Sequence, residues 1–469
     1  MDIQIVNRSE KILDPNMDLI DKIGMMARIC YKNENQDREV SKRIIKKCIE
    51  SGHESILEHG IISLFVNREV NDDSKFFSQW TQNKQPVIFS RVWDSVETDA
   101  QKRYIQPFVD PEISDKHVFR QTGTRPSIPG KNLTRCFVGD VRAWRQVMRE
   151  RFYLATQTCN QIQFVLDLLV LRELDKVDGD HILFGDIVDV YNKFLSDKDR
   201  RDMMMIGEVK FDDDVYTVET IANHYFKCDD TVMAEQASSA ASLSVIITTD
   251  RATTHQLVRH RKDVAYSQES QRYVNYDKKG YRCIPMTLES SKFPDDFIED
   301  YDLGRVRSTS EAYKEWYAAM KDAFTHYHNL QHIYDDESGK SDLIIPPETC
   351  RGVLPNDAAT VIGVTWLRTA SFLNFCFWRL DHHAQYSIRA TIARIVRDIF
   401  YMKHPFTTSL PHKIVMGWFN SIKEQKIFKD NTVIEKIEEY QIRLQKLVDA
   451  EIEKMKKEQA AAAESAEKK

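Results

Sequence analysis

Arginine, histidine, glutamine and tyrosine side chains gather in the segment RHRKDVAYSQESQRYVNY, which runs from Arg259 to Tyr276. Guanidinium groups stay charged and present planar forks of donors, which suit phosphates and the carbonyl oxygens of a flat ring. Amide, hydroxyl and imidazole groups can read a nucleobase edge, and tyrosine rings offer stacking surfaces. The segment therefore predicts a binding site for an anionic planar ligand. The alternative interpretation is a solvated charged face with scattered salt bridges.

Regular elements on both sides are expected to position this segment. The run SLSVIITT has strand composition, and Asp250 is a suitable cap for a short helix, RATTHQLV, that leads into the arginines. Upstream, the turn SGHESILEHG follows an expected helix and precedes the strand-like run IISLFV. Downstream, apolar spacing predicts core-forming helices over 310–334, 359–378 and 383–401. The arginines should lie at a helix end and in the following loop.

Composition and charge limit the possible partners. The chain has 469 residues, 42% of them hydrophobic and 29% charged, which is typical of a globular protein. Its net charge of −6 gives no general basic field, so a nucleic-acid partner is not expected. The eight cysteines show no paired spacing, and no stretch has the apolar length of a membrane span or a signal core. We expect a protein of the cytoplasm, with no membrane partner.

The character of the sequence changes twice along the chain. Between about residues 71 and 236 it reads as an inserted, mainly helical subdomain, with a long helix from Asp140 to Leu171. Residues 1–70 and 237–405 should form one catalytic domain around it. Residues 406–469 read as C-terminal helices with a charged tail, and the helix near 433–455 is a candidate docking surface.

Four motifs, in order, resemble those of the flavin-dependent thymidylate synthases. RHRKDVAYSQESQRY resembles that family's arginine-rich signature, and HESILEH its histidine- and acid-containing turn. CRGVLPN resembles its third motif and RLDHHAQYSIR its closing helix. The chain is thus similar to a divergent member of this family with a large insertion.

The resemblance implies an α/β (α+β) fold, usually a homotetramer whose active sites are shared between subunits. It also implies methylation of dUMP to dTMP. Methylenetetrahydrofolate would supply the carbon, and FAD reduced by NADPH would supply the hydride. Arginines at the uracil carbonyls would stabilise the negative charge that develops on the ring.

Residue by residue, the resemblance implies two sets of site residues. The cofactor-binding positions are His53, Ser55, Glu58, Arg259, His260 and Arg261. The nucleotide-binding positions are Gln256, Gln268, Ser270, Arg272, Arg351 and Arg379. Ser270, Arg259 and Arg379 are the implied catalytic residues, with Ser270 orienting and polarising dUMP rather than attacking it. Tyr273 is a candidate stacking surface.

The chain also departs from the family pattern. One extra residue, most simply within 262–265, precedes Ser270, and a bulge there could reposition the serine. Gln268 stands where the family usually has a glutamate, which puts base selectivity in question. The family's flavin-gripping asparagine and arginine have no clear counterpart in VTWLRTASFLNF, where Arg368 is the arginine nearby. Asp140, Arg142 and Arg151 in the insertion resemble that motif instead, with an amphipathic helix as the alternative interpretation.

Other histidines do not lead us to predict a metal site. His326, His328 and His332 do not share one helical face, and no carboxylate pattern accompanies them. Two other functions remain open beside thymidylate synthesis. One is a related flavin- and folate-dependent one-carbon transfer, such as hydroxymethylation of a pyrimidine nucleotide. The other is a noncatalytic nucleotide-binding protein that has lost its flavin.

Overall fold

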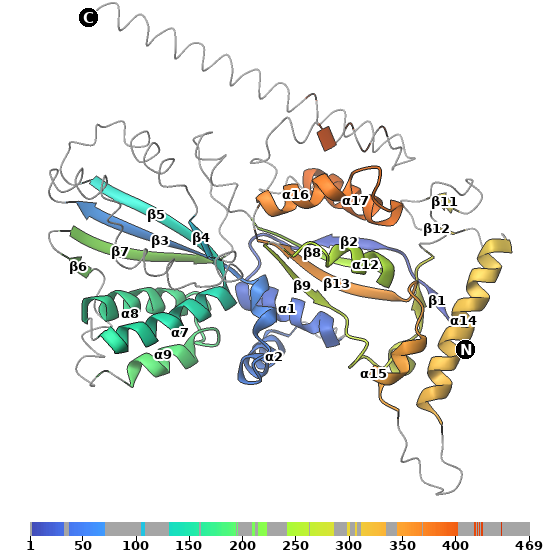
Figure 1. Cartoon of the computed structure of the whole chain (residues 1–469), viewed down its shortest axis with the longest axis horizontal. Coiled ribbons are helices and arrows are strands. Elements are labelled where there is room, and N and C mark those ends of the chain that lie inside the picture. The colour runs from blue at the N-terminus through green and yellow to red at the C-terminus, as the bar shows by residue number, and fades with distance from the viewer. Residues whose placement is uncertain are drawn as a thin grey trace, which may run out of the picture.

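The computed structural model describes residues 2–31, 37–70, 105–107, 131–158, 161–193, 195, 209–211, 214–222, 242–261, 263–285, 298–300, 305–306, 311–333, 345–367 and 369–401, with 417, 418, 420, 422, 424 and 442. Two larger antiparallel sheets lie side by side in this part of the chain, and helices pack against each (Figure 1). The expected mixture of helices and strands is confirmed. Arg368 and nearly all of 406–469, including the predicted docking helix, lie outside the described residues.

The first sheet joins strands that are far apart in the sequence. Its order is β2 (Ser9–Ile12), β8 (Leu243–Asp250), β13 (Ala359–Trp366) and β9 (Val264–Gln268). All pairs are antiparallel, and β13 lies between β8 and β9. The predicted helix over 359–378 is therefore wrong in its first half. ATVIGVTW forms a buried strand rich in β-branched residues. The spacing of apolar residues in so short a run cannot distinguish a buried strand from a buried helix.

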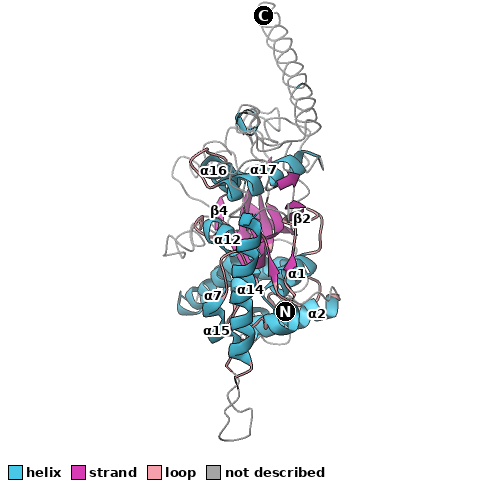
Figure 2. Cartoon of the chain, turned by 90° about the vertical axis from the view of Figure 1, so that its right-hand side faces the viewer, coloured by secondary structure: helices cyan, strands magenta, loops and turns pink. Residues whose placement is uncertain are grey.

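Helices cover both faces of this sheet, as the side view in Figure 2 shows. α16 (Thr369–Arg379) and α17 (Tyr386–Tyr401) lie on one face and share a core with Trp366. α1 (Leu19–Tyr31) lies on the other, at β9 and β13. Gly363 permits this close packing, because a Cβ there would lie 2.3 Å from Met26 Sδ. The sheet is thus a buried layer between helices.

The second sheet combines the N-terminal segment with the insertion. Its order is β4 (Ile105–Pro107), β5 (Lys131–Asp140), β3 (Ile61–Val70), β7 (Asp214–Ala222) and β6 (Val209–Phe211). β3 pairs with insertion strands on both sides. In its described part, the insertion therefore contributes strands as well as helices.

Three helices of the insertion pack beside this sheet: α7 (Val141–Thr158), α8 (Gln161–Asp175) and α9 (Gly185–Asn192). The single helix that we predicted from Asp140 is thus divided between α7 and α8. In both sheets a strand leads directly into two helices, β5 into α7 and α8, and β13 into α16 and α17. The described helices include none with the length and apolar composition needed to cross a bilayer.

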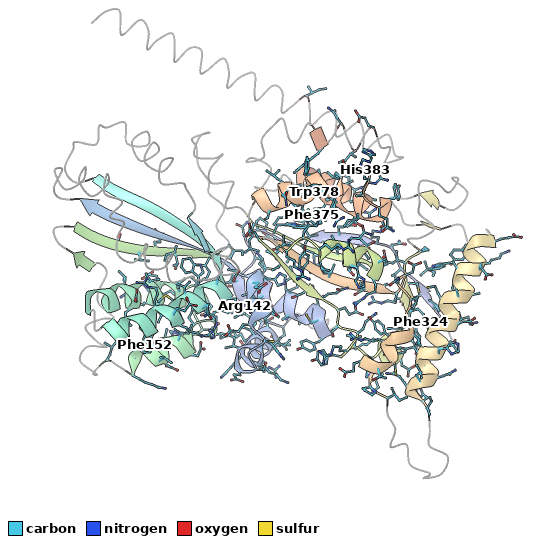
Figure 3. All side chains as sticks on the ribbon, viewed as in Figure 1. Arg142, Phe152, Phe324, Phe375, Trp378 and His383 are labelled. Carbon is cyan, nitrogen blue, oxygen red and sulfur yellow. The ribbon has the colours of Figure 1, made fainter. Side chains whose placement is uncertain are left out.

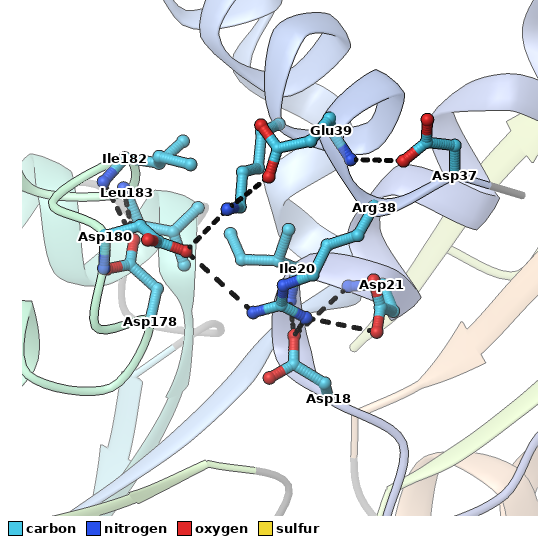
Figure 4. A network of polar contacts seen from close by, with 11 residues as sticks. Asp18, Ile20, Asp21, Asp37, Arg38, Glu39, Asp178, Asp180, Ile182 and Leu183 are labelled. Carbon is cyan, nitrogen blue, oxygen red and sulfur yellow. Dashed lines mark hydrogen bonds and ion pairs between the residues drawn. The ribbon is translucent and has the colours of Figure 1, made fainter.

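Polar contacts dock the insertion onto α2 (Arg38–Glu50) and its neighbours. In the loop before α9, Asp180 lies 3.2 Å from Lys42 Nζ and 4.0 Å from Arg38 Nη2 (Figure 4). Arg145 of α7 is fully buried and binds Glu54 at 3.0 Å and Asp186 at 2.7 Å. Exposed pairs contribute little, whereas breaking a buried pair is costly, so Arg145 dominates this contact.

Candidate functional site

The helix α12 (Arg251–Leu257) leads from β8 into the arginine-rich segment, as the sequence predicts. Asp250 caps it, because its Oδ1 accepts a hydrogen bond of 2.8 Å from Thr253 N. The helix has seven residues and spans about 10 Å. Arg251 stands at its first position, and Gln256 and Arg259 lie at its other end.

Arg379, the last residue of α16, reaches the C-terminal end of α12. Its Nε donates to His260 Nε2 at 2.8 Å, and its Nη2 donates to the Gln256 carbonyl at 3.1 Å. Since a guanidinium can only donate, His260 Nε2 accepts and the imidazole is neutral. Burial, and then the charge of Arg379, lower the pKa of His260 to about 4. His260 therefore carries no charge near neutral pH.

Positive charge is concentrated beside this contact. Burial, and then the nearby charge of Arg259, lower the pKa of Arg379. Arg259 itself is exposed. Among the described residues, no ion pair with a carboxylate involves either arginine. Two neighbouring guanidinium groups that are not neutralised by such a pair can bind an anion or the carbonyl oxygens of a ring.

A second cationic group lies at the N-terminal end of α12. Burial and the charge of Arg351 lower the pKa of Arg251, while Tyr276 and Glu269 act in the opposite direction. Arg272 lies further along the segment, with its Nε 3.1 Å from Glu348 Oε2. That pair is half exposed, at 53% and 49%, so an incoming anion can replace the carboxylate at little cost.

The tyrosine that we proposed for stacking is open to solvent. Tyr273 is 58% exposed, and its ring lies 5.8 Å from the ring of Tyr31. The Arg272 guanidinium lies 5.5 Å from its centroid, within cation–π range. The ring is available to a planar ligand on its free side.

The turn before β9 contains a residue in an unusual backbone conformation. Asp263 adopts a left-handed conformation with φ 55°, and its carbonyl accepts a hydrogen bond from Leu367 N at 2.9 Å. From Val264 to Gln268, β9 then pairs with β13 in unbroken register. Within the described residues, β9 therefore carries no bulge between Val264 and Gln268, and the strand that leads to Ser270 is regular.

Polar side chains at the end of β9 are held by local hydrogen bonds. Gln268 Nε2 donates to Thr254 Oγ1 at 2.8 Å, which ties β9 to α12. Ser270 N donates to the Cys30 carbonyl at 3.1 Å, and Ser270 Oγ accepts from Arg272 N at 3.3 Å. The Ser270 hydroxyl proton thus remains available for a ligand. The residue after Gln268 is an acid, Glu269. Its side chain is buried, and its Oε2 lies 3.4 Å from Arg282 Nη2.

The turn HESILEH forms a short helix, η1 (Glu54–His59), beside α7. His53 and Ser55 are exposed, whereas both acids contact arginines of the insertion. Glu54 lies 2.6 Å from Arg149 Nη2 in addition to its contact with Arg145. Glu58 accepts a hydrogen bond from Arg142, which is labelled in Figure 3. The insertion therefore supplies the partners of this turn.

His59, at the end of the same turn, was missed by the sequence reasoning. It is fully buried, and its ring nitrogens lie 2.8 Å from Thr365 Oγ1 and 2.9 Å from Ser267 Oγ. Burial, and then the charge of Lys22, lower its pKa to about 3. The second histidine of HESILEH, next to apolar residues, was the available signal. It fastens η1 to both β9 and β13.

The turn and α12 lie on opposite faces of β9. Successive side chains of a strand point to opposite faces. Ser267 contacts His59 of η1, and the next residue, Gln268, contacts Thr254 of α12. Within one chain, the structure thus brings together Gln256, Arg259, His260 and Arg379, and it holds His53, Ser55 and Glu58 on the other face.

The motif in the insertion is only partly available to a ligand. Asp140 is buried and caps α7 by accepting from Ala143 N at 2.8 Å, and burial raises its pKa well above the usual value. Arg151 is 2% exposed and lies 2.6 Å from the buried Asp167. Arg142 is exposed and contacts Glu58. Of the three, Arg142 is the residue in a position to meet a ligand.

Comparison with known proteins finds a likeness for the segment that carries these residues. Residues 222–406 match the model of the family described as thymidylate synthase complementing protein. The match includes α12, β9, β13, α16 and α17, and so both cationic groups.

A curated relative gives a more particular likeness. The flavin-dependent thymidylate synthase of Clostridium tetani (strain Massachusetts / E88) is 30% identical over 149 residues. The aligned region is 32% of this chain and 54% of the relative. The chain thus spans about half the length of this relative, and most of the insertion lies outside the family match.

Proposed function

We propose that this protein methylates dUMP to dTMP, with methylenetetrahydrofolate as carbon donor, NADPH as reductant and FAD as cofactor. The observation that carries the proposal is the contact of Arg379 with His260 and Gln256. It joins the signature motif to the closing helix within the segment that matches the family. The name of the Clostridium tetani relative supports the same activity.

The two ends of α12 suit the two ends of a nucleotide. We assign the uracil ring to Arg259, Arg379 and the amide of Gln256, where guanidinium donors can stabilise negative charge on the carbonyl oxygens. We assign the phosphate to Arg351, Arg272 and the hydroxyl of Ser270. The separation of about 10 Å along α12 allows one ligand to reach both groups. Neutral His260 keeps Arg379 in place without adding a third charge.

The exposed residues His53, Ser55 and Arg261 have the donors that a flavin and its diphosphate require, and we assign them, with Glu58, Arg259 and His260, to FAD. When bound and reduced by NADPH, FAD would supply the hydride that converts the transferred carbon to a methyl group. His53 and Ser55 lie on the opposite face of β9 from Arg379. We therefore propose that the turn of one subunit completes the site of another, in a homotetramer.

A specific observation favours a second candidate, one-carbon transfer to a different pyrimidine nucleotide. Position 268 presents an amide that is engaged by Thr254, and the neighbouring carboxylate of Glu269 is buried against Arg282. An amide and a carboxylate read a different pattern of donors and acceptors on a base. The base that is methylated can therefore differ from uracil.

Product analysis tests the proposal. Purified protein is incubated with FAD, NADPH and methylenetetrahydrofolate, together with dUMP or dCMP, and the nucleotides are separated by mass. We expect dTMP from dUMP, and an oxidised-flavin absorbance band that NADPH bleaches. A methylated or hydroxymethylated product from dCMP would establish the second candidate. A colourless protein that takes up no FAD would indicate a noncatalytic nucleotide-binding protein.

Arg379→Gln tests the assignment of the uracil end. Hydrogen bonds to charged groups contribute about 1.5–3 kcal/mol, so dUMP affinity should fall about 10- to 150-fold. Arg43→Gln is the matched control, because Arg43 is an exposed arginine of α2. Isothermal titration with dUMP measures both variants. Equal dUMP affinity in Arg379→Gln and Arg43→Gln would refute the placement.

A further inference from the structure

Asp277, His328 and His332 form a cluster outside the site described above. Asp277 lies in α13 (Tyr276–Lys279), at the end of the arginine-rich segment. His328 lies in the last turn of α14 (Glu311–Gln331), and His332 directly follows that helix. His328 Nδ1 is 2.6 Å from Asp277 Oδ1, and His332 Nε2 is 3.5 Å from Asp277 Oδ2. The carboxylate therefore contacts two imidazoles from a distant part of the sequence, and the centroids of these two rings lie 4.1 Å apart.

Hydrogen bonds around the cluster orient its members. His332 Nδ1 lies 2.8 Å from the His328 carbonyl, which can only accept, so Nδ1 carries the proton. In the neutral ring, Nε2 is then a lone pair that faces a carboxylate oxygen. Two facing acceptors are unfavourable unless a proton or a metal cation lies between them. Tyr281 donates its hydroxyl proton to Asp277 Oδ1 at 2.6 Å and fixes the carboxylate. Metal-binding histidines and carboxylates have outer partners of these kinds.

We propose that Asp277, His328 and His332 bind a divalent transition metal of the zinc class. Zinc binds imidazole and carboxylate at about 2.0–2.2 Å, so neighbouring ligand atoms of a tetrahedral site lie about 3.3–3.5 Å apart. The three ligand atoms lie within 4.8 Å of one another. The distance from His332 Nε2 to Asp277 Oδ2, 3.5 Å, already lies in this range. The distance from His328 Nδ1 to Asp277 Oδ1, 2.6 Å, would have to increase by about 0.7 Å.

The chemistry of the ligands selects the metal. Two imidazole nitrogens favour zinc and its neighbours over magnesium and calcium, which prefer oxygen ligands. The side chains are partly exposed, at 23% for Asp277, 40% for His328 and 41% for His332, so an ion can enter from solvent. Three protein ligands leave a fourth position for water.

The metal would join α13 to α14. These elements share an aromatic core in which Tyr276 and Tyr281 pack near Phe324 and Tyr327 (Figure 3). A metal at its edge would fix the segment that follows Ser270 and Arg272. Our sequence reasoning weighed His326, His328 and His332, and also His382 and His383, without Asp277, and it predicted no metal site. Among the described residues, the second group of this type is Asp381, His382 and His383, which are consecutive and exposed and show no comparable outer partners there.

Equilibrium dialysis of the full-length protein against zinc, with the bound metal counted by mass spectrometry, tests the proposal. His332→Ala and Asp277→Asn should each bind one zinc fewer per chain than the wild type. His326→Ala is the matched control, because His326 is an exposed histidine of α14 outside the cluster, and it should keep the wild-type count. Tyr281→Phe should weaken this site about 10- to 100-fold without abolishing it.

An equal zinc count in the wild type, His332→Ala and Asp277→Asn would overturn the proposal and leave a hydrogen-bonded cluster only. Circular dichroism verifies that each variant is folded. If a variant fails to fold, anomalous diffraction from zinc-soaked crystals of the wild type decides the question. A peak between the three residues supports the site, and its absence overturns it. Neither measurement depends on nucleotide or flavin chemistry.

Discussion

The histidine that joins η1 to the first sheet should make the protein sensitive to acid. His59 is fully buried, and its pKa is about 3 in the folded state against 6.5 as the ordinary value. Between these values the unfolded chain binds a proton that the folded chain does not, so stability falls as the pH falls. The loss is about 1.4 kcal/mol per pH unit. Between pH 6.5 and pH 5 it amounts to about 2 kcal/mol.

His59→Gln removes this titration and keeps a side chain that can bond to one hydroxyl. Urea unfolding at pH 7 and pH 5, followed by tryptophan fluorescence, gives the free energy of unfolding. We expect the wild type to lose about 2 kcal/mol more than His59→Gln over this interval. Other titrating groups cancel in the comparison. At pH 7 the variant should be less stable by about 1–3 kcal/mol, because one buried hydroxyl loses a hydrogen bond.

The matched control is His326→Gln, which changes an exposed histidine of α14. It should retain the pH dependence of the wild type. If His59→Gln loses as much stability between pH 7 and pH 5 as the wild type does, the histidine is not held neutral by burial, and the assigned role of His59 is refuted.

Three further substitutions test other parts of the structure. Arg145→Met should lower the free energy of unfolding by about 1.5–3 kcal/mol in urea denaturation, since it removes the hydrogen bonds of a fully buried guanidinium to Glu54 and Asp186; an effect below about 1 kcal/mol would contradict it. Gly280→Ala should cost about 1–3 kcal/mol because Gly280 has φ 88°, whereas Gly352→Ala, in open space without positive φ, should be nearly neutral in the same assay. Arg272→Ala should weaken dUMP binding in titration calorimetry but leave the melting temperature nearly unchanged, because its pair with Glu348 is half exposed; a large drop in melting temperature would argue against this.

Local signals predicted the elements around the signature. Asp250 caps α12 as expected, because an N-cap depends on a side chain and on the backbone donors that follow it directly. The strand β8 was evident from its β-branched residues. The strand β13, which begins at Ala359, could not be predicted in this way. ATVIGVTW forms a strand because it pairs with β8 on one side and β9 on the other. That pairing joins residues more than 90 positions apart, and local composition cannot report it.

The site residues also divide into those that the sequence could identify and those that depend on distant partners. Arg379 and the signature could be proposed to meet, because their motifs resemble one family, and the structure provides the contact between Arg379 and His260. His59 and Asp277 could not be identified in this way. The role of each depends on partners that are remote in the sequence, at 365 and 267 for His59 and at 328 and 332 for Asp277.

The insertion is part of the support of the candidate site. Arg142 of α7 contacts Glu58, and the next residue along η1, His59, contacts Ser267 of β9. A chain of direct contacts therefore leads from the insertion to the strand that precedes Ser270. Arg145 and Arg149 hold the other acid of the turn, Glu54, from the same helix. Removing the insertion would leave both acids of η1 without these partners, so we expect the turn to lose its position along with the insertion.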